Sequence, residues 1–267
     1  NSTIYIEGGT IVKAQGGSGR GSSGGAGIGS GDIGSGYTGS STTNITISGG
    51  TIKEAVGGNT GDGIGGGGSS NNTTVTINGG RIEKAQGGQG YSIFDGGDGI
   101  HSDGDLTISG NATIVSAIGG SGGSGVGSSG AGNGIYSGGK LAIEGGTIGT
   151  AKGGNATADY KGGGHGIYSN KELSINGGTI ENAQGGSGRS GGYGIRSSNM
   201  LTISDNAAIT NATGGSGRRG GNGLFGTAMK IISSTIGTAK GGEGKTSGGH
   251  GIYSVGQLTI SDNAAIT

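Results

Sequence analysis

The stretch GGGHGIYSNKELSINGGTIENAQGG, residues 162–186, decides the fold because close copies of it recur along the chain. Related segments stand at residues 132–154 (GNGIYSGGKLAIEGGTIGTAKGG) and 248–267 (GGHGIYSVGQLTISDNAAIT). Self-similarity at periods of roughly 20–50 residues is typical of repeat architectures. An alanine followed by a glycine pair marks successive repeats at intervals of 41, 30, 32, 34, 32, 29 and 27 residues: Ala14, Ala55, Ala85, Ala117, Ala151, Ala183, Ala212 and Ala239.

Each repeat contains short apolar segments of period two, such as LSI, TIENA and GIYS. Alternation over so few residues buries one face of a strand and does not fit a helix. The span from the GI dipeptide to the next glycine pair is 17–19 residues in the last five repeats, whereas the glycine-rich span varies between 7 and 16. Coils held in register with one variable corner are typical of a solenoid.

We therefore predict an all-β fold, a right-handed parallel β-helix of about eight to nine coils of 27–41 residues, with one variable glycine-rich loop per coil. Residues 1–267 form a single domain, in which residues 1–60 are less regular than residues 61–267. The core is predicted to contain two aliphatic columns, Leu106, Leu141, Leu173, Leu201 and Leu258 in one and Ile108, Ile143, Ile175, Ile203 and Ile260 in the other.

Glycine accounts for 77 of the 267 residues. Glycine provides the positive φ angles and the close backbone approach that corners of a narrow solenoid need. The glycine-rich loops could form layers resembling polyglycine II, but their uneven lengths favour irregular stacking.

The composition excludes several function classes. Sixteen basic and sixteen acidic residues leave no net charge, which argues against nucleic-acid binding. No apolar run approaches the ~18 residues of a membrane-spanning helix, and without cysteine the chain has neither disulfides nor thiolate metal sites. The bias toward Ser, Thr, Asn and Gly resembles secreted bacterial surface proteins. We therefore expect an extracellular location at the bacterial cell surface.

The frames GDGIHSDGDLTISGNATI (97–114) and GHGIYSNKELSINGGTI (164–180) resemble the carbohydrate-binding right-handed β-helix family of clostridial surface proteins. Glycine-rich adhesins have similar repeats. The resemblance implies binding of a plant polysaccharide such as cellulose or pectin, with calcium at the edge of the helix. This sequence departs from the family at the acidic positions, since the places equivalent to Asp98 hold Asn133, His165, Tyr193, Asn222 and His250.

The residue after the isoleucine or leucine of each GI-type strand is predicted to point outward, because side chains alternate along a strand. The resulting column concentrates the planar side chains of a chain with few of them. Planar rings at coil spacing suit the stacking of sugar rings, although rings in such a column could also simply pack on one another. The candidate ligand-binding residues are His101, Tyr136, Tyr168, Arg196, Phe225 and Tyr253.

One group of acidic residues is a candidate calcium site: Asp95, Asp98, Asp103 and Asp105, with His101 among them. Aspartate next to glycine is also ordinary turn chemistry, so both interpretations stay open. No other cofactor is expected. We expect no catalytic residues, because the clustered carboxylates of polysaccharide hydrolases are otherwise missing from the sequence.

These features favour a non-enzymatic extracellular scaffold that binds a polysaccharide or cell-surface glycan. The alternative is a fibre subunit that stacks end to end, since the chain begins and stops inside strand frames without polar capping repeats. That feature would equally fit an excerpt of a longer protein. Less favoured are a polysaccharide lyase and an ice-binding protein, the latter suggested by an interrupted threonine column.

Overall fold

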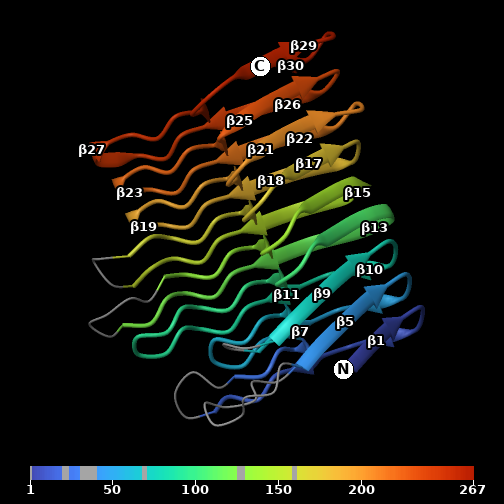
Figure 1. Cartoon of the computed structure of the whole chain (residues 1–267). Helices are drawn as coiled ribbons and strands as arrows, with labels where there is room; N and C mark the ends of the chain where they lie inside the picture. Colours follow the sequence, from blue (N-terminus) through green and yellow to red (C-terminus); the bar gives the residue numbers. More distant parts are fainter. Residues whose placement is uncertain (1, 20–23, 31–40, 68–70, 125–129, 158–160) are drawn as a thin grey trace.

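The computed structural model describes residues 2–19, 24–30, 41–67, 71–124, 130–157 and 161–267. This part of the chain is all β and contains no helix, hence no helix that could cross a membrane. Parallel strands stack coil upon coil from the N-terminus to the C-terminus (Figure 1). The prediction of a parallel β-solenoid is confirmed.

The largest sheet has 19 strands and forms two sides of each coil. Its first side consists of β1 (Ser2–Ile6), β5 (Ser41–Ile47), β9 (Asn71–Ile77), β13 (Leu106–Ile118), β15 (Leu141–Lys152), β17 (Leu173–Asn176), β21 (Met200–Ser204), β25 (Ala228–Ile232) and β29 (Leu258–Ser261). Its second side consists of β2 (Thr10–Ile11), β3 (Ala14–Gln15), β6 (Thr51–Ile52), β7 (Ala55–Val56), β10 (Arg81–Ile82), β11 (Ala85–Gln86), the ends of β13 and β15, β18 (Thr179–Gln184), β22 (Ala208–Thr213), β26 (Thr235–Lys240) and β30 (Ala265–Ile266).

An eight-stranded sheet forms the third side of the coil. Its strands are β4 (Ile28–Gly29), β8 (Ile64–Gly65), β12 (Ile100–Ser102), β14 (Ile135–Ser137), β16 (Ile167–Ser169), β20 (Ile195–Ser197), β24 (Leu224–Gly226) and β28 (Ile252–Ser254). The solenoid has about seven complete turns, and partial coils at both ends account for the slightly larger number predicted.

Aliphatic side chains fill the interior in the predicted columns. Leu106, Leu141, Leu173 and Leu201 are register partners from coil to coil. Met229 fills the place between Leu201 and Leu258. The eight marker alanines also pair in one unbroken column, and those from Ala55 to Ala212 are completely buried. The period-two pattern therefore identified the inner face of each strand.

At the last coil, Leu258 and Ile260 are 43% and 48% exposed, although the same columns are buried in the interior of the stack. End-to-end association stays a prediction.

Threonine occupies an outward position on the first side, as expected. Thr46, Thr76 and Thr107 are register partners. Ala142 and Ser174 interrupt the column before Thr202, and Lys230 interrupts it before Thr259. Threonine suits an exposed strand position for reasons of propensity alone.

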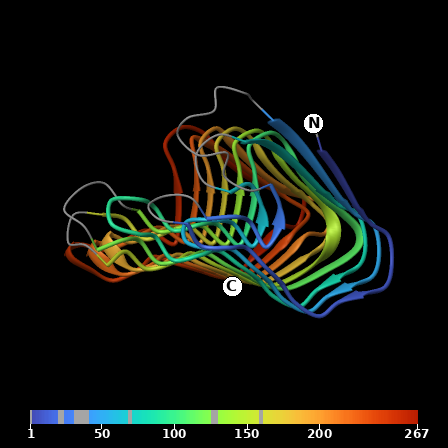
Figure 2. The same cartoon turned by 90° about the horizontal axis from the view of Figure 1, so that it is seen from below.

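The glycine-rich segments form a flat arm that projects from one corner of the three-sided coil (Figure 2). In each coil the chain leaves this corner through a short glycine segment, such as residues 153–154, and returns through another, such as residues 163–164. We call these segments the glycine legs of the arm. Hydrogen bonds cross between the two legs: Gly154 N donates to Gly132 O, Gly164 N to Gly154 O, and Gly186 N to Gly164 O, at 2.8–3.0 Å. The same pattern continues through Gly192, Gly215, Gly221, Gly242 and Gly249.

This regular ladder contradicts the expectation of irregular stacking at these glycines. The unequal loop lengths are absorbed farther out along the arm, and residues 125–129 of the longest loop lie outside the described part of the chain. Where the last loops have nearly equal lengths they pair as a three-stranded sheet, β19 (Gly188–Ser190), β23 (Gly217–Arg219) and β27 (Gly244–Ser247).

Close approach explains why the legs are glycine. A Cβ added to Gly186 would lie 1.8 Å from the carbonyl oxygen of Gly154, and one added to Gly164 would lie 1.8 Å from that of Gly132. The positive φ angles predicted for the corner glycines occur at other positions, mainly at the turns of the coil. Gly178, for example, has a φ of 76°. Lack of a side chain, more than backbone freedom, is what the arm requires.

Candidate functional site

A column of hydrogen-bond acceptors runs along the stack where the arm meets the eight-stranded sheet. Its members stand two residues before the isoleucine or leucine of most GI-type strands, and Ala26 and Tyr193 hold this place in the other two. Asp62 Oδ1 accepts from Asp98 N at 2.7 Å, and Asn133 Oδ1 accepts from His165 N at 2.8 Å. His165 Nδ1 likewise accepts from Tyr193 N at 2.8 Å. The position therefore favours Asp, Asn or His, each of which can accept a hydrogen bond from the next coil.

The predicted outward column lies beside these acceptors. Register pairs link its members from coil to coil in the order His101, Tyr136, Tyr168, Arg196, Phe225 and Tyr253. The interior members are half-buried, whereas Tyr253 in the last coil is 39% exposed. The structure thus brings all six predicted residues together. Their role in ligand binding stays a prediction.

The two columns interlock into one ladder of rings. Centroids of His101 and Tyr136 are 4.9 Å apart, and those of Tyr136 and Tyr168 are 5.3 Å apart, with the planes tilted by 44° and 56°. Farther along, the plane of Tyr193 is nearly parallel to those of His165 and Phe225, at angles of 6° and 8° and distances of 5.1 Å. Parallel rings cover each other's faces. Tyr136 is tilted against both of its neighbours, so neither of them covers a face of its ring in parallel.

Arg196 lies among these rings. Its guanidinium carbon is 4.7 Å from the centre of the Tyr168 ring and 5.4 Å from that of Tyr193, which are cation–π distances. Its Nη1 is 3.0 Å from Nε2 of His165. Burial, together with the positive charge of Arg196, lowers the pKa of His165 to about 3. His165 is therefore neutral at neutral pH.

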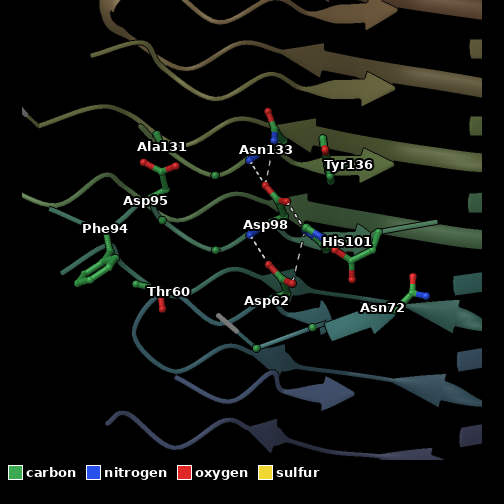
Figure 3. Close-up of a pocket in the computed structure, with 16 residues that line it drawn as sticks. Thr60, Asp62, Asn72, Phe94, Asp95, Asp98, His101, Ala131, Asn133 and Tyr136 are labelled. Carbon is green, nitrogen blue, oxygen red and sulfur yellow. Dashed lines mark hydrogen bonds and ion pairs between the residues drawn. The ribbon is translucent and has the colours of Figure 1, made fainter. Parts of the chain in front are cut away.

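A cavity of about 710 Å³ lies at the N-terminal end of the ladder, between the arm and the eight-stranded sheet (Figure 3). Its residues come from three successive coils. Asp62, Asp98 and Asn133 are stacked one above the other, and His101 and Tyr136 lie beside them (Figure 3). Phe94, Asp95 and Ala131 line the cavity from the arm, and Asn72 and Asp103 line it from the coil.

His101 is the centre of a charged cluster in this cavity. Its Nδ1 is 2.7 Å from Oδ2 of Asp98 and 3.6 Å from Oδ2 of Asp62. Its Nε2 is 3.2 Å from Oδ1 of Asp103. The imidazole therefore lies between Asp62 of the preceding coil and two carboxylates of its own coil. These are Asp98, before its strand, and Asp103, in the turn after its strand.

Electrostatics shift the pKa values of this cluster. Burial disfavours charge on His101, but the neighbouring carboxylates of Asp62, Asp103 and Asp98 outweigh it and hold the pKa of His101 well above its ordinary value. Burial raises the pKa of Asp62 to about 7. Burial also acts on Asp103, but the hydrogen bond with His101 keeps the pKa of Asp103 below its usual range. The cluster thus carries a cationic imidazole at neutral pH.

The predicted acidic group is divided by the structure. Asp98 and Asp103 both contact His101. Asp95 lines the same cavity, but its Oδ1 accepts a hydrogen bond from Gly130 N. Asp105 instead accepts from Lys140 N at 2.8 Å, in the turn before the next strand. Asp95 and Asp105 are therefore not part of the His101 cluster.

The sequence interpretation missed Asp62. The signal was present, because GDGI occurs at residues 61–64 and again at 97–100. In a solenoid, residues one repeat apart are neighbours, so identical tetrapeptides place Asp62 directly below Asp98. Grouping the aspartates by nearness in the sequence concealed this relationship.

Comparison with models of known protein families, with curated proteins and with solved structures gives no match.

Proposed function

We propose that this chain is a non-enzymatic, extracellular scaffold of a bacterial surface that binds polysaccharide along the ring ladder, with its main saccharide site in the cavity around Tyr136. The observation that supports this most is the cavity at one end of the ladder, where an aromatic ring converges with two amides and several carboxylates. Concave sites that combine apolar surface with a few convergent polar groups are typical of ligand binding.

The ring geometry supports a saccharide near Tyr136. Sugar rings bind through their C–H faces, which requires an aromatic face that is not covered. Tyr136 is tilted by 44° against His101 and by 56° against Tyr168, so neither neighbour covers it in parallel. Burial raises the pKa of the Tyr136 hydroxyl, which keeps it protonated and able to donate a hydrogen bond.

Polar groups around this ring match sugar hydroxyls. Asn72 presents an amide and Asp103 a carboxylate on the coil side of the cavity. Asp98 and Asn133 are already fixed by hydrogen bonds to each other, with Asn133 Nδ2 donating to Asp98 Oδ1 at 3.0 Å. Polar groups held rigidly by their neighbours bind hydroxyls without a large loss of side-chain entropy.

A binding assay with matched variants tests the proposal. Tyr136, Tyr168 and Tyr253 are changed together to serine, and binding to insoluble cellulose, pectin and chitin is measured by pull-down. We expect a loss of about tenfold or more, since aromatic contacts contribute ~0.5–1.5 kcal/mol each. The control changes Tyr5 and Tyr91 to serine, because these tyrosines are 68% and 54% exposed and lie outside the ladder.

Undiminished binding in the triple variant, with a circular dichroism spectrum like that of the wild type, would show that the ladder is purely structural. A loss in the Tyr5 and Tyr91 control of the same size would place the glycan site elsewhere. Failure of the wild-type protein to bind any polysaccharide in a broad glycan panel would contradict the proposal as a whole.

A further inference from the structure

We propose that Asp62, Asp98 and His101 form a binding site for one divalent first-row transition-metal ion, of the zinc class, at the floor of the cavity. The inference goes beyond the proposed glycan binding and does not depend on it. It shares Asp98 and His101 with the calcium site considered from the sequence, but it adds Asp62, leaves out Asp95 and Asp105, and takes a different metal.

The three ligand atoms converge. One carboxylate oxygen of Asp62, one of Asp98 and a ring nitrogen of His101 all lie within 4.8 Å of one another. Two ligands at zinc distances of ~2.1 Å in a tetrahedral arrangement are about 3.4 Å apart. The Nδ1 to Asp62 Oδ2 distance of 3.6 Å is close to this value, and the 2.7 Å contact to Asp98 Oδ2 needs to lengthen by less than about 1 Å.

Each aspartate is anchored through one oxygen and presents the other. Asp62 Oδ1 accepts from Asp98 N, and Asp98 Oδ1 accepts from the backbone and side-chain nitrogens of Asn133. The second oxygens, both Oδ2, face His101. The acceptor column thus fixes these carboxylates as part of the fold, and the orientation of the presented oxygens requires no further ordering.

The outer shell of the site is also in place. A histidine that ligates a metal usually donates its other ring N–H to a carboxylate or carbonyl. Here Nε2 of His101 is 3.2 Å from Asp103 Oδ1, while Asp103 Oδ2 accepts a hydrogen bond from Thr73 N at 2.8 Å. Asp103 would therefore hold the imidazole with Nδ1 directed at the metal, and binding of the metal would displace the Nδ1 proton to solvent.

The site has room for a metal and for exchangeable ligands. Below His101 in the outward column stands Gly65, and a Cβ there would lie 3.1 Å from Asp62 Oδ2 and 2.8 Å from the His101 Cβ. The cavity of about 710 Å³ opens on the other side. Three protein ligands with an open position are typical of zinc sites that bind water or substrate.

The donor set selects the metal class. Imidazole suits zinc and its first-row neighbours, whereas calcium prefers six to eight oxygen ligands. One imidazole nitrogen and two carboxylate oxygens therefore favour zinc, cobalt or manganese over calcium.

Metal titration of the full chain tests the proposal. The protein is treated with EDTA, dialysed, and titrated separately with Zn²⁺, Mn²⁺ and Ca²⁺ at neutral pH by isothermal calorimetry, and Co²⁺ absorption reports coordination by nitrogen and oxygen. We expect one equivalent of Zn²⁺ to bind and Ca²⁺ to bind far more weakly. His101→Ala should abolish binding, and Asp103→Asn should weaken it roughly 10–100-fold, as is common for outer-shell residues.

His250→Ala is the matched control, since His250 is exposed and lies outside the cluster; its Zn²⁺ affinity should equal that of the wild type. If His101→Ala fails to fold, Asp62→Asn keeps the size and the Oδ1 acceptor of Asp62 and should still weaken Zn²⁺ binding at least tenfold. Absence of stoichiometric binding, equal binding in the cluster variants, or a preference for Ca²⁺ would overturn the proposal. Polysaccharide pull-down with and without EDTA keeps this result separate from the proposed glycan binding.

Discussion

The amide nitrogen of Gly186 donates a hydrogen bond to the carbonyl oxygen of Gly164 at 2.8 Å, and this bond ties the outgoing glycine leg of one coil to the returning leg of the coil below. Gly192 N in turn donates to Gly186 O at 2.8 Å. Successive bonds of this kind run in one direction along the stack, and chains of aligned hydrogen bonds strengthen one another. The arm is therefore an ordered second layer of the solenoid.

We predict that Gly186→Ala destabilises the protein severely, by about 3 kcal/mol or more. The new Cβ would lie 1.8 Å from Gly154 O, which would force the legs apart and break the ladder locally. Gly248→Ala is the control in the same arm, because the nearest atom to its Cβ would be 3.8 Å away. Thermal unfolding followed by circular dichroism measures both, and equal melting temperatures would contradict the role of the ladder.

How far the sequence predicts this fold differs between its two layers. The aliphatic and alanine columns could be read directly, because period-two burial leaves a regular pattern in the sequence. The pairing of the glycine legs could not be predicted in this way. The legs stand at fixed places at the base of the arm, but the glycine-rich spans of 7–16 residues differ in length and obscure the period of the repeat. Recognising them required the backbone distances that only glycine permits.

The candidate site shows the same contrast. The order His101, Tyr136, Tyr168 along the outward column followed from alternation within the GI strands and is seen in the register. The partnership of Asp62 with His101 did not follow from local sequence, because it joins residues 39 positions apart (101 − 62) through the stacking of coils. Ring tilts and cavities depend on packing between coils, which a linear pattern does not encode.

Ile175→Asp should abolish the native structure or destabilise it by more than about 4 kcal/mol. Ile175 is completely buried between Ile143 and Ile203 of the neighbouring coils. A carboxylate there would be buried without a partner. Ser174→Asp is the control, since Ser174 lies on the opposite face of the same strand. Denaturant unfolding should separate the two variants clearly, and similar midpoints would mean that the inner face has been misassigned.

Ser169→Ala is expected to destabilise the protein by about 1–3 kcal/mol through loss of a corner hydrogen bond. Ser169 is completely buried, and its hydroxyl contacts the carbonyl oxygens of Gly139 at 3.0 Å and Glu172 at 2.8 Å. Removal of the hydroxyl leaves the buried carbonyl of Gly139 without this donor, whereas the carbonyl of Glu172 keeps its hydrogen bond from Leu141 N. Ser174→Ala, on the outer face, should change the free energy of unfolding by less than about 0.5 kcal/mol. Chemical denaturation of both variants checks the difference, which would vanish if water replaced the hydroxyl.

The pKa of His165 predicts a pH dependence of stability. This pKa is about 3 in the folded state because of burial and the charge of Arg196, whereas an unfolded histidine has a pKa near 6.5. Above about pH 6.5 His165 is neutral in both states and contributes no pH dependence. Below it the unfolded state binds the proton more readily, so stability falls as the pH drops from about 6.5 toward 3, by about 1 kcal/mol per pH unit for this partly exposed ring.

His165→Asn isolates this effect. Asn133 and Asn222 occupy the equivalent place in other coils, and their Oδ1 atoms accept the backbone N–H of the next coil at 2.8 and 2.7 Å. Asparagine should therefore keep the hydrogen bond to Tyr193 N but cannot titrate. Loss of ring contacts lowers the stability of the variant equally at every pH, and other titrating groups, including the His101 cluster, are common to both proteins. The difference in unfolding free energy between wild type and variant should therefore be constant above pH 6.5. Below pH 6.5 the wild type should lose stability relative to the variant as the pH falls. A difference that does not change between about pH 7 and pH 5 would mean that His165 can accept a proton beside Arg196 in the folded coil.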